Sequence, residues 1–368
     1  MLKDHATPGG TAGYAKGFTN YKENYRPMLG MSVSSVGIGT YLGDEDAATD
    51  AAYAEAIRAA VLGGINLVDT AVNYRCQRSE RVIGRVIAEL AGSGQVKREQ
   101  IVIATKGGYI AFDGEMPADP RGWFEKNFLR PGIVKPNELV QGSHCMTPRY
   151  LEAMLEVSRS NLRLETIDIY YVHNPETQRS AVGHDEFLAR IQTAFEFLES
   201  AAAAGKIVRY GIATWNGFRL KPNESGYLSL MELISAATDI AGAGHHFRVI
   251  QLPYNLAMTE ALTLRNQALP GGDQVSLLAA ADAMGVAVCA SASLLQGQLT
   301  SRLPEVLQSA FPEMESDAER SIQFVRSTPG IGVALVGMSS AAHVAHNLAT
   351  LKHPPAPEAL MKLFTPAG

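Results

Sequence analysis

Four polar residues of the chain follow short apolar runs: Asp69, Tyr74, Lys106 and His173. A lysine or an aspartate in such a place is costly to bury alone, so we expect Lys106 and Asp69 to pair. A cation beside a phenol favours the phenolate and helps the phenol to give up its proton. The four residues could therefore carry out acid–base chemistry, with Tyr74 as the group that exchanges the proton.

The chain that must position these residues alternates between short β-branched runs and longer amphipathic ones. Strands are expected over 33–43, 63–71, 101–105, 167–173, 206–214, 247–254, 286–293 and 330–337. Helices are expected over 46–62, 79–90, 148–162, 185–204, 227–241, 274–284 and 317–328, with a last one from Ser340. Eight such units in series predict an α/β fold, a closed (β/α)8 TIM barrel. An open doubly wound sheet is the alternative, but no strand is followed by its GxGxxG fingerprint.

The predicted domain organisation is one barrel over 27–368, preceded by a flexible or surface-laid N-terminal arm over 1–26. Because the carboxyl ends of barrel strands meet at one rim, the four polar residues are expected to share a pocket. The connection over 107–149 is long and holds five aromatic residues, which are Tyr109, Phe112, Trp123, Phe124 and Phe128. Long connections are often functional, so this one is expected to form a pocket wall or lid. A surface excursion or an oligomer contact is the other interpretation.

The composition favours a small-molecule partner. The net charge of -5 comes from 32 basic and 37 acidic residues without a long basic run, so nucleic acid is not an expected partner. No stretch approaches the roughly 18 apolar residues of a membrane span, so no membrane association is expected. Three cysteines without a close pair fit a reducing cytoplasm and predict no metal site. Both a monomer and an oligomer are compatible with these features.

Several motifs, taken in order, resemble the aldo-keto reductase superfamily. DTAVNY matches its Asp-Thr-Ala-x-x-Tyr signature, ATK its strand-three lysine, and YYVHNPE its strand-four histidine. The stretches SRSNLRLETIDIYYVH, RYGIATWN and VIQLPYN are also similar to the family, and the resemblance runs from about residue 30 to 352.

This resemblance implies a nicotinamide-dependent oxidoreductase that interconverts a carbonyl compound and an alcohol. Hydride would pass between the nicotinamide C4 and the substrate carbon. Tyr74 would act as general acid in reduction and as base in oxidation, with Asp69, Lys106 and His173 completing the catalytic set. Sugars, steroids, polyketides and simple aldehydes are all compatible substrates.

The resemblance also implies an extended dinucleotide site along the rim, with NADPH as the expected cofactor and NADH as the alternative. The expected cofactor-binding residues are Thr40, Tyr41, Thr214, Gln251, Ser291, Leu294, Gly297, Gly337, Ser339, Ser340, His343 and Asn347. Gln251 would hydrogen-bond the carboxamide, and the helix that begins near Ser340 would offer its N-terminus to phosphate.

Three positions depart from the family pattern. Ala213 and Thr214 stand where many members have Ser-Asn, and Ser291 stands where an aromatic residue commonly stacks on the nicotinamide. The stretch with Ser339 and His343 holds no Arg or Lys for the 2'-phosphate of NADPH. Hydroxyls and an imidazole would hold this phosphate less firmly than a guanidinium, which keeps NADH as a serious alternative.

Two other functions compete with the reductase. A barrel lyase or aldolase would use Lys106 for a Schiff base, which needs a lysine with a depressed pKa, and the expected pairing with Asp69 argues against it. A nicotinamide-binding regulatory or scaffolding subunit with little turnover is the second. The three departures favour that subunit, and the complete catalytic set opposes it.

Overall fold

The computed structural model describes residues 1–21 and 23–364. Its centre is a closed barrel of parallel strands in the order β11-β12-β3-β4-β5-β6-β7-β8. These strands are β3 (Val36–Gly39), β4 (Leu67–Asp69), β5 (Val102–Gly107), β6 (Ile167–His173), β7 (Ile207–Ala213), β8 (Phe247–Pro253), β11 (Ala287–Ser291) and β12 (Val333–Gly337). The (β/α)8 barrel predicted from the sequence is therefore confirmed.

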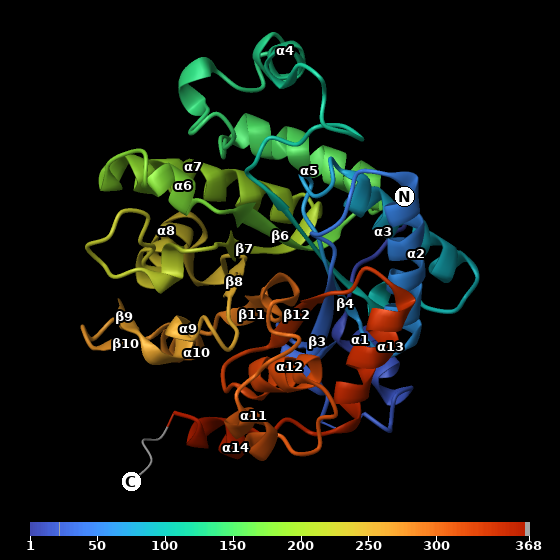
Figure 1. Cartoon of the computed structure of the whole chain (residues 1–368). Helices are drawn as coiled ribbons and strands as arrows, with labels where there is room; N and C mark the ends of the chain where they lie inside the picture. Colours follow the sequence, from blue (N-terminus) through green and yellow to red (C-terminus); the bar gives the residue numbers. More distant parts are fainter. Residues whose placement is uncertain (22, 365–368) are drawn as a thin grey trace.

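Helices connect the strands and surround the barrel (Figure 1). The main ones are α2 (Ala47–Leu62), α3 (Arg78–Gly92), α5 (Pro148–Leu162), α7 (His184–Ala203), α8 (Leu230–Ala241), α10 (Leu277–Ala283), α12 (Asp317–Ser327) and α13 (Ala341–Ala349). Several begin at a polar side chain that accepts from a free backbone N–H group of the first turn. Asp46 caps α2, Ser316 caps α12 and Ser340 caps α13 in this way.

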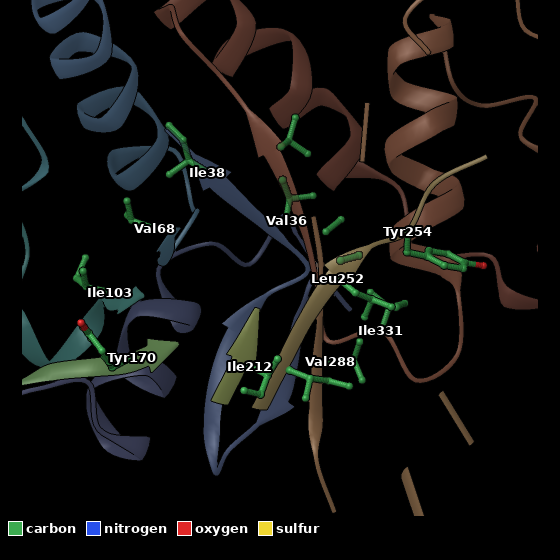
Figure 2. Packing of buried hydrophobic residues seen from close by; sticks show 14 of the residues in the cluster. Val36, Ile38, Val68, Ile103, Tyr170, Ile212, Leu252, Tyr254, Val288 and Ile331 are labelled. Atoms are coloured by element: carbon green, nitrogen blue, oxygen red, sulfur yellow. The ribbon is translucent and has the colours of Figure 1, made fainter. Parts of the chain in front are cut away.

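The main apolar core lies between the strands and the surrounding helices. Figure 2 shows Ile38, Val68 and Ile103 on neighbouring strands pointing to the same side, and all three are fully buried. β-branched side chains of this kind pack well on a pleated surface. The packing fixes the strands, and the strands in turn fix the polar residues at their carboxyl ends.

The strand expected over 33–43 is split in the structure. Met31–Ser34 forms β2, which pairs with β1 (Tyr25–Met28) in an antiparallel hairpin, and barrel strand β3 begins at Val36. At the break, the Ser34 hydroxyl donates to the backbone oxygen of Val36 (2.7 Å). Such a local hydrogen bond competes with the regular ladder, and the periodicity of the sequence does not reveal it.

The helices expected over 227–241 and 274–284 both begin later than predicted. Residues Gln274–Ser276 form strand β10, which pairs with β9 (Arg265–Ala268), and α10 starts at Leu277. Ser276 and Ser229 act as N-caps of α10 and α8. In both cases a serine hydroxyl sets the first helical residue.

The hairpin β1–β2 closes the N-terminal end of the barrel. Its residues Met28, Met31 and Val33 are buried in one cluster with the barrel residues Val102 and Ile169. The opposite, carboxyl end of the barrel carries the polar residues considered below. The N-terminal end of the barrel is thus covered by apolar residues of the hairpin, whereas polar residues lie at the carboxyl end.

The segment over 1–26, expected as an arm, carries helix α1 (Pro8–Lys16) and packs against the barrel helices. Tyr14 of α1 is buried, and its hydroxyl donates to the backbone oxygen of Val61 in α2. Within residues 1–21 and 23–364, no helix is both long and apolar enough to cross a membrane.

A buried aspartate ties this segment to the barrel. Asp168 of β6 accepts from the backbone N–H of Ala6 (2.6 Å) and from that of Ile103 (2.7 Å). It also forms an ion pair with Arg98 at 2.6 Å, and both side chains are almost fully buried. One carboxylate therefore joins three separate parts of the chain.

Replacement of Asp168 by alanine should destabilise the protein by about 3 to 5 kcal/mol, because Arg98 would stay buried without its counter-charge. The free energy of unfolding in urea measures this loss. Asp185→Ala, at a fully exposed side chain, is the control and should change it by less than about 0.5 kcal/mol. A loss as small as the control's in Asp168→Ala would contradict this assignment.

Candidate active site

The carboxyl ends of β4, β5 and β6 bring the four polar residues together. Asp69 ends β4, Lys106 lies near the end of β5, His173 ends β6, and Tyr74 lies in the turn that follows β4. Asp69, Tyr74 and His173 line a cavity of about 970 Å³ that opens at this rim. Lys106 lies beneath it and is almost fully buried.

An ion pair inside the barrel organises the group. Lys106 Nζ donates to Asp69 Oδ2 at 2.7 Å and to the backbone oxygen of Thr70 at 2.7 Å. Its third contact is the Tyr74 hydroxyl, at 3.3 Å. Burial by itself would lower the pKa of Lys106, but Asp69 and Tyr74 outweigh it and raise the pKa. The lysine is therefore held as a cation, as expected from the sequence.

Tyr74 faces the cavity, as Asp69 and His173 do. Its ring lies edge-on to Tyr41, with ring centres 5.0 Å apart, and to His173 at 5.9 Å. Burial raises the pKa of the Tyr74 phenol, and the charge of Lys106 opposes that rise. The phenol is thus protonated, and Lys106 lies where its positive charge would stabilise the phenolate.

The turn after Tyr74 has an unusual backbone. Arg75, Cys76 and Gln77 all have positive φ values of 48°, 51° and 72°, a conformation that L-residues rarely adopt. Arg75 holds the turn in place, because its guanidinium pairs with Asp50 at 2.6 Å and lies 5.4 Å from the centre of the Tyr53 ring. The strained turn fixes the start of α3 and the position of Tyr74.

His173 is supported from behind by a second histidine. The Nε2–H of His144 donates to the backbone oxygen of His173 (2.7 Å), and its Nδ1 accepts from the side-chain amide of Gln178 (3.0 Å). The ring of Tyr109 packs edge-on against both histidines, at 5.2 and 5.3 Å. Burial lowers the pKa of His173 well below its usual value, and the charge of Lys106 adds to this effect. His173 is therefore neutral.

Most of the expected cofactor residues surround the same cavity. Those that line it are Thr40, Tyr41, Thr214, Gln251, Ser291, Leu294, Gly297, Gly337, Ser339, His343 and Asn347. Ser340 is not among the lining residues, because its hydroxyl is the N-cap of α13 and accepts from the backbone N–H of His343 (3.2 Å). The residues come from the ends of β3, β7, β8, β11 and β12 and from α13, so the cavity crosses much of the rim.

Three of these side chains are engaged within the protein. The Thr40 hydroxyl donates to the backbone oxygen of Asp69 at 3.3 Å. The amide of Gln251 donates to Asp69 Oδ1 at 2.7 Å, on the carboxylate oxygen that Lys106 leaves free. The Thr214 hydroxyl accepts from the backbone N–H of Gly217 at 2.8 Å. Gln251 therefore takes part in the ion-pair network, a role that its place in the sequence did not indicate.

The cavity also has lining residues that the sequence analysis missed. His346 lies one helical turn after His343 on α13, and its Nε2 is 3.4 Å from Glu319. The i, i+3 spacing of the two histidines is the signal that could have revealed it. Asn73 is another: its side-chain oxygen is buried and has no hydrogen-bond partner in the described part of the chain.

The long connection over 107–149 contributes less to the cavity than its aromatic residues suggested. Only Tyr109 of the described residues in this connection lines the cavity. Phe112, Trp123 and Phe128 instead pack on one another and on Tyr150 of α5, with neighbouring ring centres 5.1 to 5.7 Å apart. In Figure 1 this part of the chain, with α4 (Pro120–Phe124), stands beyond α5. A stable aromatic cluster on α5 explains the sequence pattern.

The stability of the protein should fall as the pH is lowered from about 6.5 to 4. Burial lowers the pKa of His144 to about 4, from about 6.5 in the unfolded chain. Between pH 6.5 and 4, His144 is therefore protonated in the unfolded state but not in the folded state. The free energy of unfolding falls by on the order of 3 kcal/mol by pH 4.

Urea unfolding at pH 7.5, 5.5 and 4.5 measures this loss. His144→Gln, which keeps a donor and an acceptor, should have a flatter pH dependence than the parent protein. His184→Gln, at a largely exposed histidine, should leave the slope unchanged. Equal slopes in the parent protein and His144→Gln would show that another group causes the pH dependence.

Comparisons with known proteins agree with this architecture. Among solved structures, the barrel is similar to an aldo/keto reductase from Klebsiella pneumoniae in complex with NADP and acetate. The TM-score is 0.61 at 22% identity, covering 93% of this chain and 94% of that one. It is also similar to the glycerol dehydrogenase from Gluconobacter oxydans, with a TM-score of 0.63 at 20% identity, covering 93% and 94%. At such identities the likeness shows the fold.

Two curated proteins are similar in sequence over part of their length. The aldo-keto reductase YhdN of Bacillus subtilis is 31% identical over 195 residues, which is 51% of this chain and 45% of that protein. A 6-dehydroglucose reductase of Novosphingobium aromaticivorans is 25% identical over 192 residues, 50% of this chain and 49% of that protein. The matched part of the chain thus spans about half the length of these relatives.

A family model decides the assignment. The model of the Aldo/keto reductase family matches residues 35–222, which is just over half of the chain and includes the ion pair, Tyr74 and His173. The chain belongs to the Aldo/keto reductase family.

Proposed function

We propose that this protein is an NAD(P)(H)-dependent oxidoreductase that interconverts a small carbonyl compound and its alcohol. The observation that carries the proposal is the hydrogen bond between the Tyr74 phenol and Lys106, which is itself paired with Asp69. It provides a proton donor at the cavity surface with a fixed cation behind it. Family membership and the reductase names of the curated relatives support the same reaction.

In the reductive direction, Tyr74 donates its proton to the carbonyl oxygen of the substrate. Lys106 stabilises the phenolate that remains, and Asp69 keeps Lys106 at the right distance. His173 is neutral, so it can hydrogen-bond the carbonyl oxygen without replacing Tyr74 as the proton source. In the oxidative direction the same phenol accepts the proton from the alcohol.

A nicotinamide dinucleotide, when bound, would supply or accept the hydride. The residues present fit such a molecule, because the cavity extends from Tyr74 to the N-terminus of α13, where an anion is favoured. Ser339 and His343 would meet a phosphate there. Two solved structures of the same fold, both from Klebsiella pneumoniae, are complexes with NADP and with NADPH. NADPH is therefore the cofactor we propose, with NADH as the alternative.

The substrate that we propose is a small, uncharged carbonyl compound or alcohol. Tyr41, Tyr109 and Trp215 form an aromatic wall near Tyr74. Within the described part of the chain, no arginine or lysine lines the cavity, so a carboxylated substrate would find no permanently charged side chain to pair with. The three unpaired cysteines are consistent with a cytoplasmic enzyme.

A lyase that uses Lys106 is less compatible with the geometry. A Schiff base requires a neutral amine with free approach, whereas Lys106 is almost fully buried, donates to three oxygens and has a raised pKa. A regulatory subunit that binds nicotinamide without turnover is the remaining alternative, and the following experiment distinguishes it.

Tyr74→Phe should reduce turnover by about 10²- to 10⁴-fold while leaving cofactor affinity unchanged, because only the proton donor is lost. NADPH oxidation with uncharged aromatic aldehydes gives the rate, and quenching of protein fluorescence gives the affinity. Tyr21→Phe, in the N-terminal segment, is the matched control and should behave as the parent protein. Cofactor binding without turnover in the parent protein would favour the regulatory subunit.

His343→Ala should weaken the binding of NADPH several-fold, on the order of 1 kcal/mol, and leave NADH unaffected, because only NADPH carries the 2'-phosphate. Fluorescence titrations of both cofactors at pH 6 and 8 measure the two affinities. Equal losses for the two cofactors would mean that His343 contacts a part that they share.

A further inference from the structure

A second cavity, of about 760 Å³, lies at the N-terminal end of the barrel, opposite the proposed active site. The β1–β2 hairpin, the starts of β7, β8 and β11, and the turn before β12 surround it. Three of its lining residues are arginines from separate parts of the chain: Arg26 of β1, Arg209 of β7 and Arg248 of β8. Asp282 is the acidic residue among those that line it.

The positive charge of this cavity exceeds its negative charge, because three arginines and one aspartate, Asp282, line it. Within residues 1–21 and 23–364, Arg26, Arg209 and Arg248 form no ion pair, although each is partly buried. Their guanidinium groups donate to backbone oxygens, as Arg248 does to Ala243 (2.9 Å). By contrast, the buried Arg98 and the partly buried Arg219 are each paired with a carboxylate.

A fourth arginine, Arg326, lies directly behind the cavity. Arg326 is fully buried, and its Nη2 has no hydrogen-bond partner among the described residues. Arg26 is linked to it through a hydrogen bond to its backbone oxygen. Burial lowers the pKa of Arg326 to about 9, and the charge of Arg26 adds to this effect.

Like charges gathered in a partly desolvated place repel one another, and a bound anion would offset this repulsion. Among the residues that the structure describes, no carboxylate lies within hydrogen-bond distance of these guanidinium groups. A guanidinium binds phosphate or carboxylate through two parallel hydrogen bonds, so several of them suit a ligand with more than one negative charge.

We propose that this cavity is a binding site for a small, multiply charged oxyanion, such as a phosphorylated or polycarboxylic metabolite. The site is separate from the proposed cofactor cavity, which opens at the other end of the barrel. The proposal therefore does not depend on the oxidoreductase activity. Its occupation would stabilise the hairpin end of the barrel.

Calorimetric titration with inorganic pyrophosphate at low ionic strength tests the proposal, with the carboxyl-end cavity filled by saturating NADPH. We expect saturable binding of one pyrophosphate per chain and a rise in the melting temperature. The double variant Arg209→Gln/Arg248→Gln should bind at least tenfold more weakly. The double variant Arg121→Gln/Arg130→Gln, which removes two exposed arginines outside the cavity, is the control of equal charge and should bind like the parent protein.

A second variant keeps the proposal testable if the double variant does not fold. Ala287→Glu places a carboxylate at the cavity wall and should abolish pyrophosphate binding without removing any arginine. The same titration with citrate in place of pyrophosphate distinguishes a polycarboxylate site from a phosphate site. Absence of saturable binding of both anions, or binding that neither variant weakens, would overturn the proposal.

The two proposals of this protein fail in different ways. If NADPH does not bind, the oxidoreductase proposal fails, but the titration of the cofactor-free protein still reports on the arginine cavity. If pyrophosphate heat disappears when NADPH is added and is unaffected by Arg209→Gln/Arg248→Gln, then the anion occupies the carboxyl-end cavity, and the arginine site is refuted.

Discussion

The buried ion pair of Lys106 with Asp69 is the constraint on which the active end of the barrel depends. Neither charge could stay in the barrel interior alone. Both groups are hydrogen-bonded. Lys106 donates to three oxygens, and the two oxygens of Asp69 accept from Lys106 and from Gln251. Because these contacts join β4, β5 and β8, the pair fixes the rim geometry, and it places a cation beside the Tyr74 phenol.

Elements outside the barrel complete that geometry. Tyr74 is positioned by a left-handed turn that Arg75 holds through Asp50, and His173 is held by His144, which lies at the end of the long connection. Both supports place stored strain or a buried imidazole near the cavity, as functional sites often do. The long connection thus contributes through His144 and Tyr109, whereas its aromatic cluster packs away from the cavity.

The barrel and the four polar residues could be predicted because both follow from short-range patterns: alternating periodicities, and polar residues where apolar runs end. What could not be predicted depends on contacts between distant residues. The hydrogen bond of Gln251 to Asp69 joins residues far apart in the sequence, and so does the gathering of Arg26, Arg209 and Arg248. The two β-hairpins were missed because single serine hydroxyls decide where neighbouring elements begin.

We propose that bound NADPH transfers hydride to a carbonyl carbon in this cavity while Tyr74 donates the proton. NADPH deuterated at the transferable position of C4, incubated with the protein and an aromatic aldehyde, tests it most directly. The account predicts that mass spectrometry finds a single deuterium on the carbinol carbon of the product alcohol. An alcohol without deuterium, or unchanged aldehyde in the presence of bound NADPH, would contradict it.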